Sequence, residues 1–131
     1  MILDADVLIA NERGVFDLEA WLASGPVEEC SLAAITLAEL LHGLERASSP
    51  QRARRKAYID SVRANFQILH YTESTAEIHA RLWAKLEASG AMIGYHDLIV
   101  AATALEHGHA VATFNTRHFA AVKGLKVRLP R

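Results

Sequence analysis

Three acidic side chains occupy positions where proteins with parallel sheets place their functional groups. Asp4 directly follows a short apolar run, Asp97 opens a long apolar segment, and Glu39 lies within a leucine-rich segment. In open parallel sheets, ligands bind beyond the carboxyl ends of the strands, where the strand order reverses. We therefore expect Asp4 and Asp97 to face one crevice if their strands are neighbours, and Glu39 to join them.

Three carboxylates in one crevice need a positive counter-charge. Two unit negative charges ~5 Å apart repel by roughly 3 kcal/mol at an effective dielectric constant of ~20, so the three acids resist ionising together. Carboxylate and water oxygens suit Mg2+ or Mn2+, which also take phosphate oxygens as ligands. Such an ion orients and deprotonates water for attack on a phosphodiester, and a second ion stabilises the leaving oxygen. Hydrolysis of a phosphodiester is the chemistry that this pattern favours.

Each acid also has a purely structural interpretation. Asp4 could simply end a strand, Glu39 could be a solvated helix residue, and Asp97 could favour a helix N-terminus. His96 and His118 lie near these acids in the sequence. Histidines are more often surface or core residues than ligands or catalysts, so neither is counted among the catalytic residues.

The segments that must position the acids alternate between strand and helix. Apolar runs predict short strands at 1–3, 29–32, 67–71, 110–114 and 125–129. Helical spacing and capping signals predict helices from Val7 to the break at Gly14, and at 15–22, 35–46, 51–66, from 72 or 74 to 88, and at 97–106 and 116–122. This alternation predicts right-handed crossovers and an α/β fold with a short, mostly parallel five-stranded sheet between two helical layers.

The helix predicted at 35–46 accounts for the position of Glu39. Leucines 37, 40, 41 and 44 repeat at helical spacing and place one stripe in the core. Glu39 lies roughly opposite that stripe, on the same side as Thr36, and is free to point toward the crevice. The arginines between Arg52 and Arg63 form either a solvated helix face or contacts to phosphates.

Composition sets the class of protein. The 131 residues, 51% of them apolar, predict one globular domain over 1–131. The single cysteine, Cys30, excludes an internal disulfide and any CxxC zinc site. No apolar run reaches the ~18 residues of a membrane span and no signal peptide is recognisable, so we expect a cytoplasmic protein without membrane association. A net charge of -1 means that any nucleic-acid binding depends on a local basic patch and bound cations.

Four blocks of the sequence, in order, resemble the motifs of PIN domains. Residues 3–9, Leu-Asp-Ala-Asp-Val-Leu-Ile, resemble the opening motif; 31–43 contain the second block, 97–104 the third, and 113–119 with the following Gly124-Leu125 the fourth. Single blocks of this kind recur by chance, but four in order in so short a chain are specific. The resemblance covers the entire chain and is to the VapC toxins of bacterial toxin-antitoxin pairs.

This resemblance implies a function for the acidic residues. It implies a PIN-like three-layer α/β/α fold and an Mg2+- or Mn2+-dependent endoribonuclease in which Asp4, Glu39 and Asp97 bind the metal. Asn115 stands at the fourth acidic position, Ala5 replaces the usual hydroxyl residue, and Asp6 and Thr36 are expected to assist. The resemblance also implies an RNA substrate, a VapB-like antitoxin as partner and a homodimer, with Trp21 and Trp83 as candidate interface residues.

Two other functions remain open. A haloacid-dehalogenase-type phosphatase would use Asp4 and Asp6 as nucleophile and general acid, but 113–119 contains no late carboxylate of the kind that such an enzyme needs. A PIN-fold module that binds a partner without catalysis is the second alternative. The presence of all three main acids argues against it.

Overall fold

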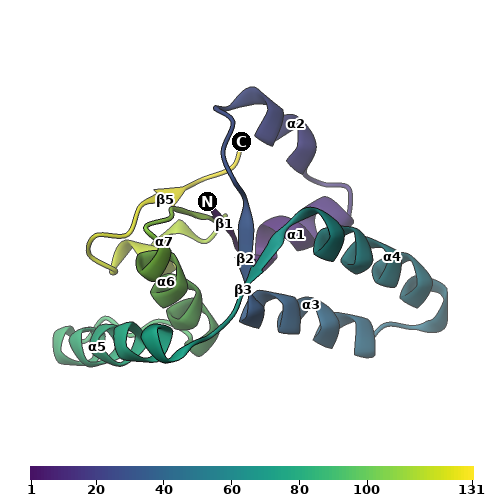
Figure 1. Ribbon diagram of the computed structural model, residues 1–131. Helices are drawn as coiled ribbons and strands as arrows, with labels where there is room; N and C mark the ends of the chain where they lie inside the picture. Colours follow the sequence, from purple (N-terminus) through teal and green to yellow (C-terminus); the bar gives the residue numbers. More distant parts are fainter.

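The protein is described by a computed structural model that covers residues 1–131. Five short strands alternate with seven helices along the chain (Figure 1). The order is β1 (Ile2–Leu3), α1 (Ala5–Glu12), α2 (Leu18–Ser24), β2 (Ser31–Ala33), α3 (Ala34–Glu45), α4 (Ser49–Asn65), β3 (Gln67–Leu69), α5 (Glu73–Ser89), α6 (Tyr95–His107), β4 (Val111–Ala112), α7 (Thr116–Ala120) and β5 (Val127–Arg128). The predicted alternation of strand and helix is confirmed.

All five strands pair in parallel, in the order β3-β2-β1-β4-β5. The chain builds one half of the sheet outward from β1 through β2 and β3, then returns to add β4 and β5 on the other side of β1. The strand order therefore reverses between β1 and β4, where a crevice is expected. Leu3 pairs with Ala112, so the residues that follow them, Asp4 and Thr113, leave the sheet side by side.

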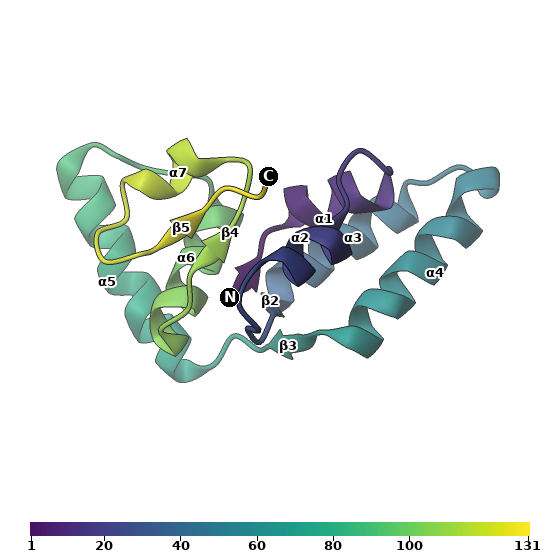
Figure 2. The ribbon, with the colours of Figure 1, turned by 90° about the horizontal axis from the view of Figure 1, so that it is seen from above.

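The two faces of the sheet are covered by separate helical layers, as Figures 1 and 2 show: α5, α6 and α7 lie on one side and α1, α3 and α4 on the other. Successive strand residues point to opposite faces. Ile2 and Val111 pack into the core beneath α5 and α6, whereas Leu3 and Ala112 pack into the core beneath α1 and α4. This is the three-layer α/β/α architecture that was predicted.

Two helices near the acidic residues begin earlier than their predicted starts because residues just before them cap their first turns. Asp4 has extended backbone angles and accepts a hydrogen bond from the Ala5 amide, so α1 starts at Ala5 rather than Val7. Gly94 is the N-cap of α6, which starts at Tyr95 and places Asp97 in its first turn. Gly108 then ends α6 with φ +66°, a left-handed conformation that favours glycine.

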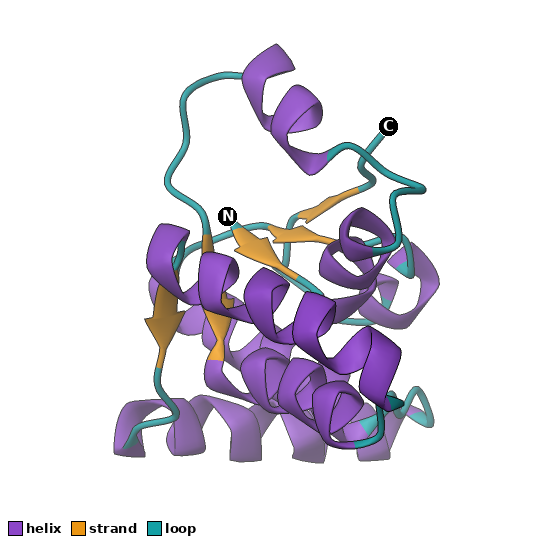
Figure 3. Ribbon diagram, turned by 90° about the vertical axis from the view of Figure 1, so that its right-hand side faces the viewer, coloured by secondary structure: helices purple, strands orange, loops and turns teal.

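Helix α2 departs from the prediction in the opposite direction. It was predicted from Val15, but it begins at Leu18 because the Asp17 carboxylate caps it, accepting a hydrogen bond from the Ala20 amide. Figure 3 shows α2 projecting from the rest of the molecule, joined to β2 by an extended segment.

None of the seven helices has both the length and the hydrophobicity that a membrane span requires.

Candidate active site

Asp4 lies at the carboxyl end of the central strand and is almost fully buried, with 6% of its surface exposed. Its Oδ1 accepts a hydrogen bond from the Ala5 amide at 2.9 Å, and its Oδ2 accepts one from the Thr113 hydroxyl at 2.8 Å. Burial, and then the nearby charge of Asp6, raises the pKa of Asp4 to about 6. The carboxylate is positioned by the fold but poorly compensated in charge.

Asp6 points from the first turn of α1 toward the end of β4. Its Oδ2 accepts hydrogen bonds from the Phe114 amide at 3.0 Å and from the Thr113 hydroxyl at 3.2 Å. Its Oδ1 is buried and has no hydrogen-bond partner. Burial raises the pKa of Asp6 above its usual value. A buried carboxylate oxygen without a partner is costly, and a bound cation would satisfy it.

Glu39 and Asp97 reach the same edge of the sheet from α3 and α6. Burial raises the pKa of Glu39, and the charges of Asp97 and Asp6 raise it further. The charge of Asp97 likewise contributes to the raised pKa of Asp4 and of Asp6. The charge of Asp97 thus acts on the other three carboxylates, and Glu39 and Asp97 line one opening, so the fold gathers these acids at one edge of the sheet.

Two histidine side chains contact the carboxylates of Glu39 and Asp97. His96 Nδ1 lies 2.9 Å from Glu39 Oε1, and His118 Nδ1 lies 2.7 Å from Asp97 Oδ2. No three acidic, histidine or cysteine side chains are arranged to hold a metal ion in this conformation. Both histidines are half-exposed, so their bonds to the carboxylates compete with water and are weak.

The two remaining residues predicted to assist do not contact the carboxylates. Asn115 is exposed, and its Nδ2 lies 3.1 Å from His118 Nδ1, so it reaches the acids only through that ring. Thr36 is fully buried in α3, and its hydroxyl has no hydrogen-bond partner. Of the three residues predicted to assist, Asp6 alone therefore contributes directly to the carboxylate cluster.

The central positioning residue, Thr113, was not singled out in the sequence. It is fully buried at the end of β4, and its hydroxyl lies between the Asp4 and Asp6 carboxylates. The same oxygen accepts a hydrogen bond from the Asn115 amide at 2.9 Å. Only the pairing of β4 with β1 places Thr113 beside Asp4, and that pairing joins residues 109 positions apart.

The donors of this site fit a hard divalent cation. Four carboxylates from three helices and a strand end supply oxygen ligands, the ligand type that Mg2+ and Mn2+ prefer. Asp6 Oδ1 is a buried oxygen without a partner, and the raised pKa values of Asp4, Asp6 and Glu39 indicate negative charge without compensation. A cation would remove both penalties.

Comparison with known proteins matches this fold. The PIN domain family model matches residues 1–125. A ribonuclease VapC1 from Rickettsia felis is 33% identical over 128 residues, covering 97% of this chain and 93% of the relative.

Solved structures resemble the whole chain. One is VapBC-5 from Mycobacterium tuberculosis, described as a member of the VapBC family of toxin-antitoxin systems, with a TM-score of 0.77, 31% identity and coverage of 99% of this chain and 96% of that one. A DNA-bound VapBC from Salmonella typhimurium has a TM-score of 0.87 at 23% identity, with coverage of 97% and 95%, and supports the fold alone.

Proposed function

This chain belongs to the PIN domain family, as one of its VapC-type members, and we propose that it is the RNA-cleaving toxin of a toxin-antitoxin pair. We propose further that it is an Mg2+- or Mn2+-dependent endoribonuclease in which Asp4, Glu39 and Asp97 bind the metal. The observation that carries the proposal is the convergence of these carboxylates with Asp6 at the β1–β4 reversal of the sheet. The family match also decides against the haloacid-dehalogenase-type phosphatase.

The proposed roles follow from what each side chain contacts. A bound Mg2+ or Mn2+ lowers the pKa of a water molecule for attack on a phosphodiester and stabilises charge on the leaving oxygen. Asp4 is held in place by the Ala5 amide and the Thr113 hydroxyl. Asp6 adds a buried, unpartnered oxygen to the acidic cluster. Asp97 is oriented by His118, and Glu39 by His96.

The two histidine bonds have a direct consequence for substrate binding. If Glu39 and Asp97 hold a cation, the ring nitrogens of His96 and His118 that now bond to them would be available to other acceptors. Phosphate oxygens accept N–H donors. Both histidines would then contact the RNA backbone in place of the protein's own carboxylates.

Nuclease assays with matched variants test this function. The purified chain should cleave structured RNA with Mg2+ or Mn2+ and lose that activity in EDTA. Asp97→Asn should lose activity at least a hundredfold, whereas Asp60→Asn, an exposed acid on α4 paired with Lys56, should cleave normally. A chain that binds RNA but never cleaves it would instead be the non-catalytic binding module.

The same variants test the proposed biological role. Expression of the chain alone should arrest bacterial growth, and expression of Asp97→Asn should not. Co-expression of a VapB-like antitoxin, the partner that the VapBC structures support, should restore growth. Equal toxicity of wild type and Asp97→Asn would contradict the nuclease mechanism.

We also propose that the chain forms a homodimer. A row of aromatic side chains crosses the surface of α5 and the start of α6: His79 stacks on Trp83, while Tyr71 and Tyr95 pack edge-on at its two ends. Trp83 and Tyr95 are 39% and 69% exposed, whereas Trp21 is half-buried against Phe16. Exposed aromatic clusters of this kind are typical of interfaces. Sedimentation velocity should show a dimer that Trp83→Glu converts to a monomer.

A further inference from the structure

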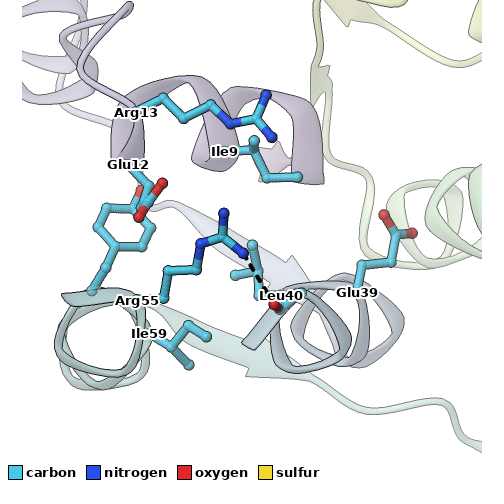
Figure 4. A pocket seen from close by; sticks show the side chains of 9 residues that line it. Ile9, Glu12, Arg13, Glu39, Leu40, Arg55 and Ile59 are labelled. Atoms are coloured by element: carbon cyan, nitrogen blue, oxygen red, sulfur yellow. Dashed lines mark hydrogen bonds between the residues drawn. The ribbon is translucent and has the colours of Figure 1, made fainter. Parts of the chain in front are cut away.

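A groove opens beside the carboxylate site, between α1, α3 and α4 (Figure 4). Its cavity volume is about 100 Å3, and Ile9, Leu40 and Ile59 form its apolar lining. Glu39 lies at one end of this groove and also lines the mouth of the active site together with Asp97. The groove and the mouth of the active site therefore adjoin each other at Glu39.

Two arginines extend into the groove from opposite walls. Figure 4 shows Arg13, which follows α1, and Arg55, on α4, with both guanidinium groups directed into the space between the helices. The Arg13 side chain forms no hydrogen bond or ion pair, and the Arg55 guanidinium donates one hydrogen bond, to the Gly43 carbonyl at 3.1 Å. Two cations without a counterion in one groove repel each other, and an anion between them would relieve that repulsion.

The acids of the groove do not supply this anion. Glu12 is paired with Arg54, whose Nε lies 3.4 Å from Glu12 Oε1. Glu39 belongs to the proposed metal site, and its charge is cancelled when a cation binds there. In the metal-bound protein the groove is then net positive, with Arg13 and Arg55 uncompensated.

We propose that this groove binds the RNA strand on one side of the scissile bond. Arg13 and Arg55 contact a backbone phosphate next to the one that is cut, and the apolar lining receives the neighbouring base. A base enters such a groove only when it is unstacked, so the site selects single-stranded RNA. This inference rests on the proposed nuclease function and adds to it the path of the substrate.

Binding of RNA to full-length variants tests the groove. A fluorescein-labelled single-stranded RNA is titrated with otherwise unmutated protein at several salt concentrations, with Ca2+ in place of Mg2+ so that the carboxylates hold a cation while cleavage is suppressed. Adding Arg13→Gln should weaken binding by roughly three- to tenfold and make the slope of log K against log salt shallower by about 0.7, the value for one lost phosphate contact. Arg55→Gln should do the same.

The control is Arg63→Gln, which removes the same charge from an exposed position on α4 that does not line the groove. The Arg13 side chain is exposed and forms no hydrogen bond or ion pair, so Arg13→Gln should leave the melting temperature unchanged. Arg55→Gln, in contrast, removes the hydrogen bond from Arg55 to the Gly43 carbonyl of α3. Equal affinity and equal salt slopes for Arg13→Gln and Arg63→Gln would overturn the proposal. So would an Arg13→Gln protein that binds RNA normally but no longer binds its antitoxin, because the groove would then be a protein-binding site.

The outcome also separates this inference from the function beneath it. If the wild-type chain cleaves RNA and Arg13→Gln binds as Arg63→Gln does, only the groove assignment is wrong. If the wild-type chain neither binds nor cleaves RNA, the proposed function fails and the groove assignment fails with it.

Discussion

The Asp4 carboxylate accepts two hydrogen bonds, yet its surroundings still disfavour the ionised form. Its partners are one amide and one hydroxyl, both neutral, and Asp6 and Asp97 oppose its charge. Helix capping explains why the chain tolerates an aspartate here. It does not explain the neighbouring acids, which indicate that the position is adapted to hold a cation.

The raised pKa of Asp4 predicts an unusual dependence of stability on pH. The pKa is about 6 in the folded chain against 3.8 for an unperturbed aspartate, so the folded state binds the proton more tightly. The resulting stabilisation is fully present below about pH 3.8 and is lost as the pH rises through 6. In EDTA, we expect wild type to gain roughly 1 kcal/mol relative to Asp4→Asn between pH 7.5 and pH 5.

Urea denaturation of both proteins at the two pH values provides the measurement. Comparison with Asp4→Asn is necessary because burial lowers the pKa of His79 and of His109, which destabilises the fold in acid. Those histidines are common to both proteins and cancel in the difference. Parallel pH profiles for wild type and Asp4→Asn would mean that Asp4 does not titrate in this range.

Replacement of Thr113 gives a second prediction for a single side chain. Thr113→Val removes the hydroxyl between Asp4 and Asp6 and leaves an Asp4 oxygen buried without a donor. We expect a loss of about 1–3 kcal/mol in stability and a weaker affinity for Mn2+. Because this hydrogen bond lowers the pKa of Asp4, the acid-induced stabilisation should also begin at a higher pH.

The matched control for Thr113 is Thr103→Val. Thr103 is equally buried, but its hydroxyl bonds to the Ile99 carbonyl within its own helix. Titration calorimetry with Mn2+ should therefore show reduced affinity for Thr113→Val only. A parallel loss in Thr103→Val would indicate a general effect of valine in the core.

Residue type and spacing predict part of this site but not its internal bonding. Asp4 and Asp97 could be placed because each adjoins an element end that periodicity makes recognisable. Thr113 could not, since its role depends on the β1–β4 register, which no local pattern encodes. Asn115 was assigned by alignment with a motif, and the structure directs its side chain to His118.

At the level of elements, helices α5 and α6 are tied together by a polar contact inside an apolar interface. Thr75 is fully buried in the first turn of α5, and its hydroxyl donates to Glu106 Oε1 at 2.6 Å. The same hydroxyl accepts a hydrogen bond from the Thr72 amide at 3.0 Å, as part of a capping box. One side chain thus starts α5 and fastens it to the last turn of α6.

We expect Thr75→Val to destabilise the protein by about 1–3 kcal/mol, because it leaves both a part-buried oxygen of Glu106 and the Thr72 N–H without their Thr75 partner. Thr75→Ser keeps the hydroxyl and should recover most of this loss. Mn2+ affinity should stay at the wild-type value, since this contact lies away from the carboxylate cluster. Thermal denaturation of the three proteins measures the first effect, and calorimetry the second.

Element boundaries show where sequence patterns succeed and where they fail. The leucine stripe of α3 and the apolar α6 were predicted to within two residues, because long periodic segments average over local irregularities. The start of α2 was misplaced by three residues because Val15 and Phe16 continue an apolar spacing, while the Asp17 cap sets the actual boundary. A strand of two residues, such as β4, is defined by its neighbours and not by its own pattern.

For the whole molecule, the proposed metal should act as a folding ligand. An ion that binds only the folded carboxylate cluster adds RT ln(1 + [L]/Kd) to stability, about 2.7 kcal/mol at a hundred times Kd. For a chain of this length that corresponds to a rise in Tm of roughly 10 °C. Asp97→Asn should lose most of this rise while melting close to wild type in EDTA, because the change removes one repulsive charge.

Differential scanning calorimetry in EDTA, Mg2+ and Mn2+ provides the test, with Asp60→Asn as a control that should respond to metal as wild type does. If no metal shifts the Tm of wild type, the acids are structural and the proposed metal site is wrong. If, in EDTA, the free energy of unfolding of Asp97→Asn alone is several kcal/mol lower than that of wild type, the Asp97 carboxylate stabilises the fold.

The central position of β1 also determines when, during its own synthesis, this protein becomes complete. The Thr113 partner of Asp4 and the neighbouring strand β4 are synthesised 109 residues after Asp4 itself. Domains fold as units once the segments that pair across them are available, and contacts this distant in sequence form late. The nascent chain therefore carries an unfinished acidic site until β4 and Thr113 have left the ribosome.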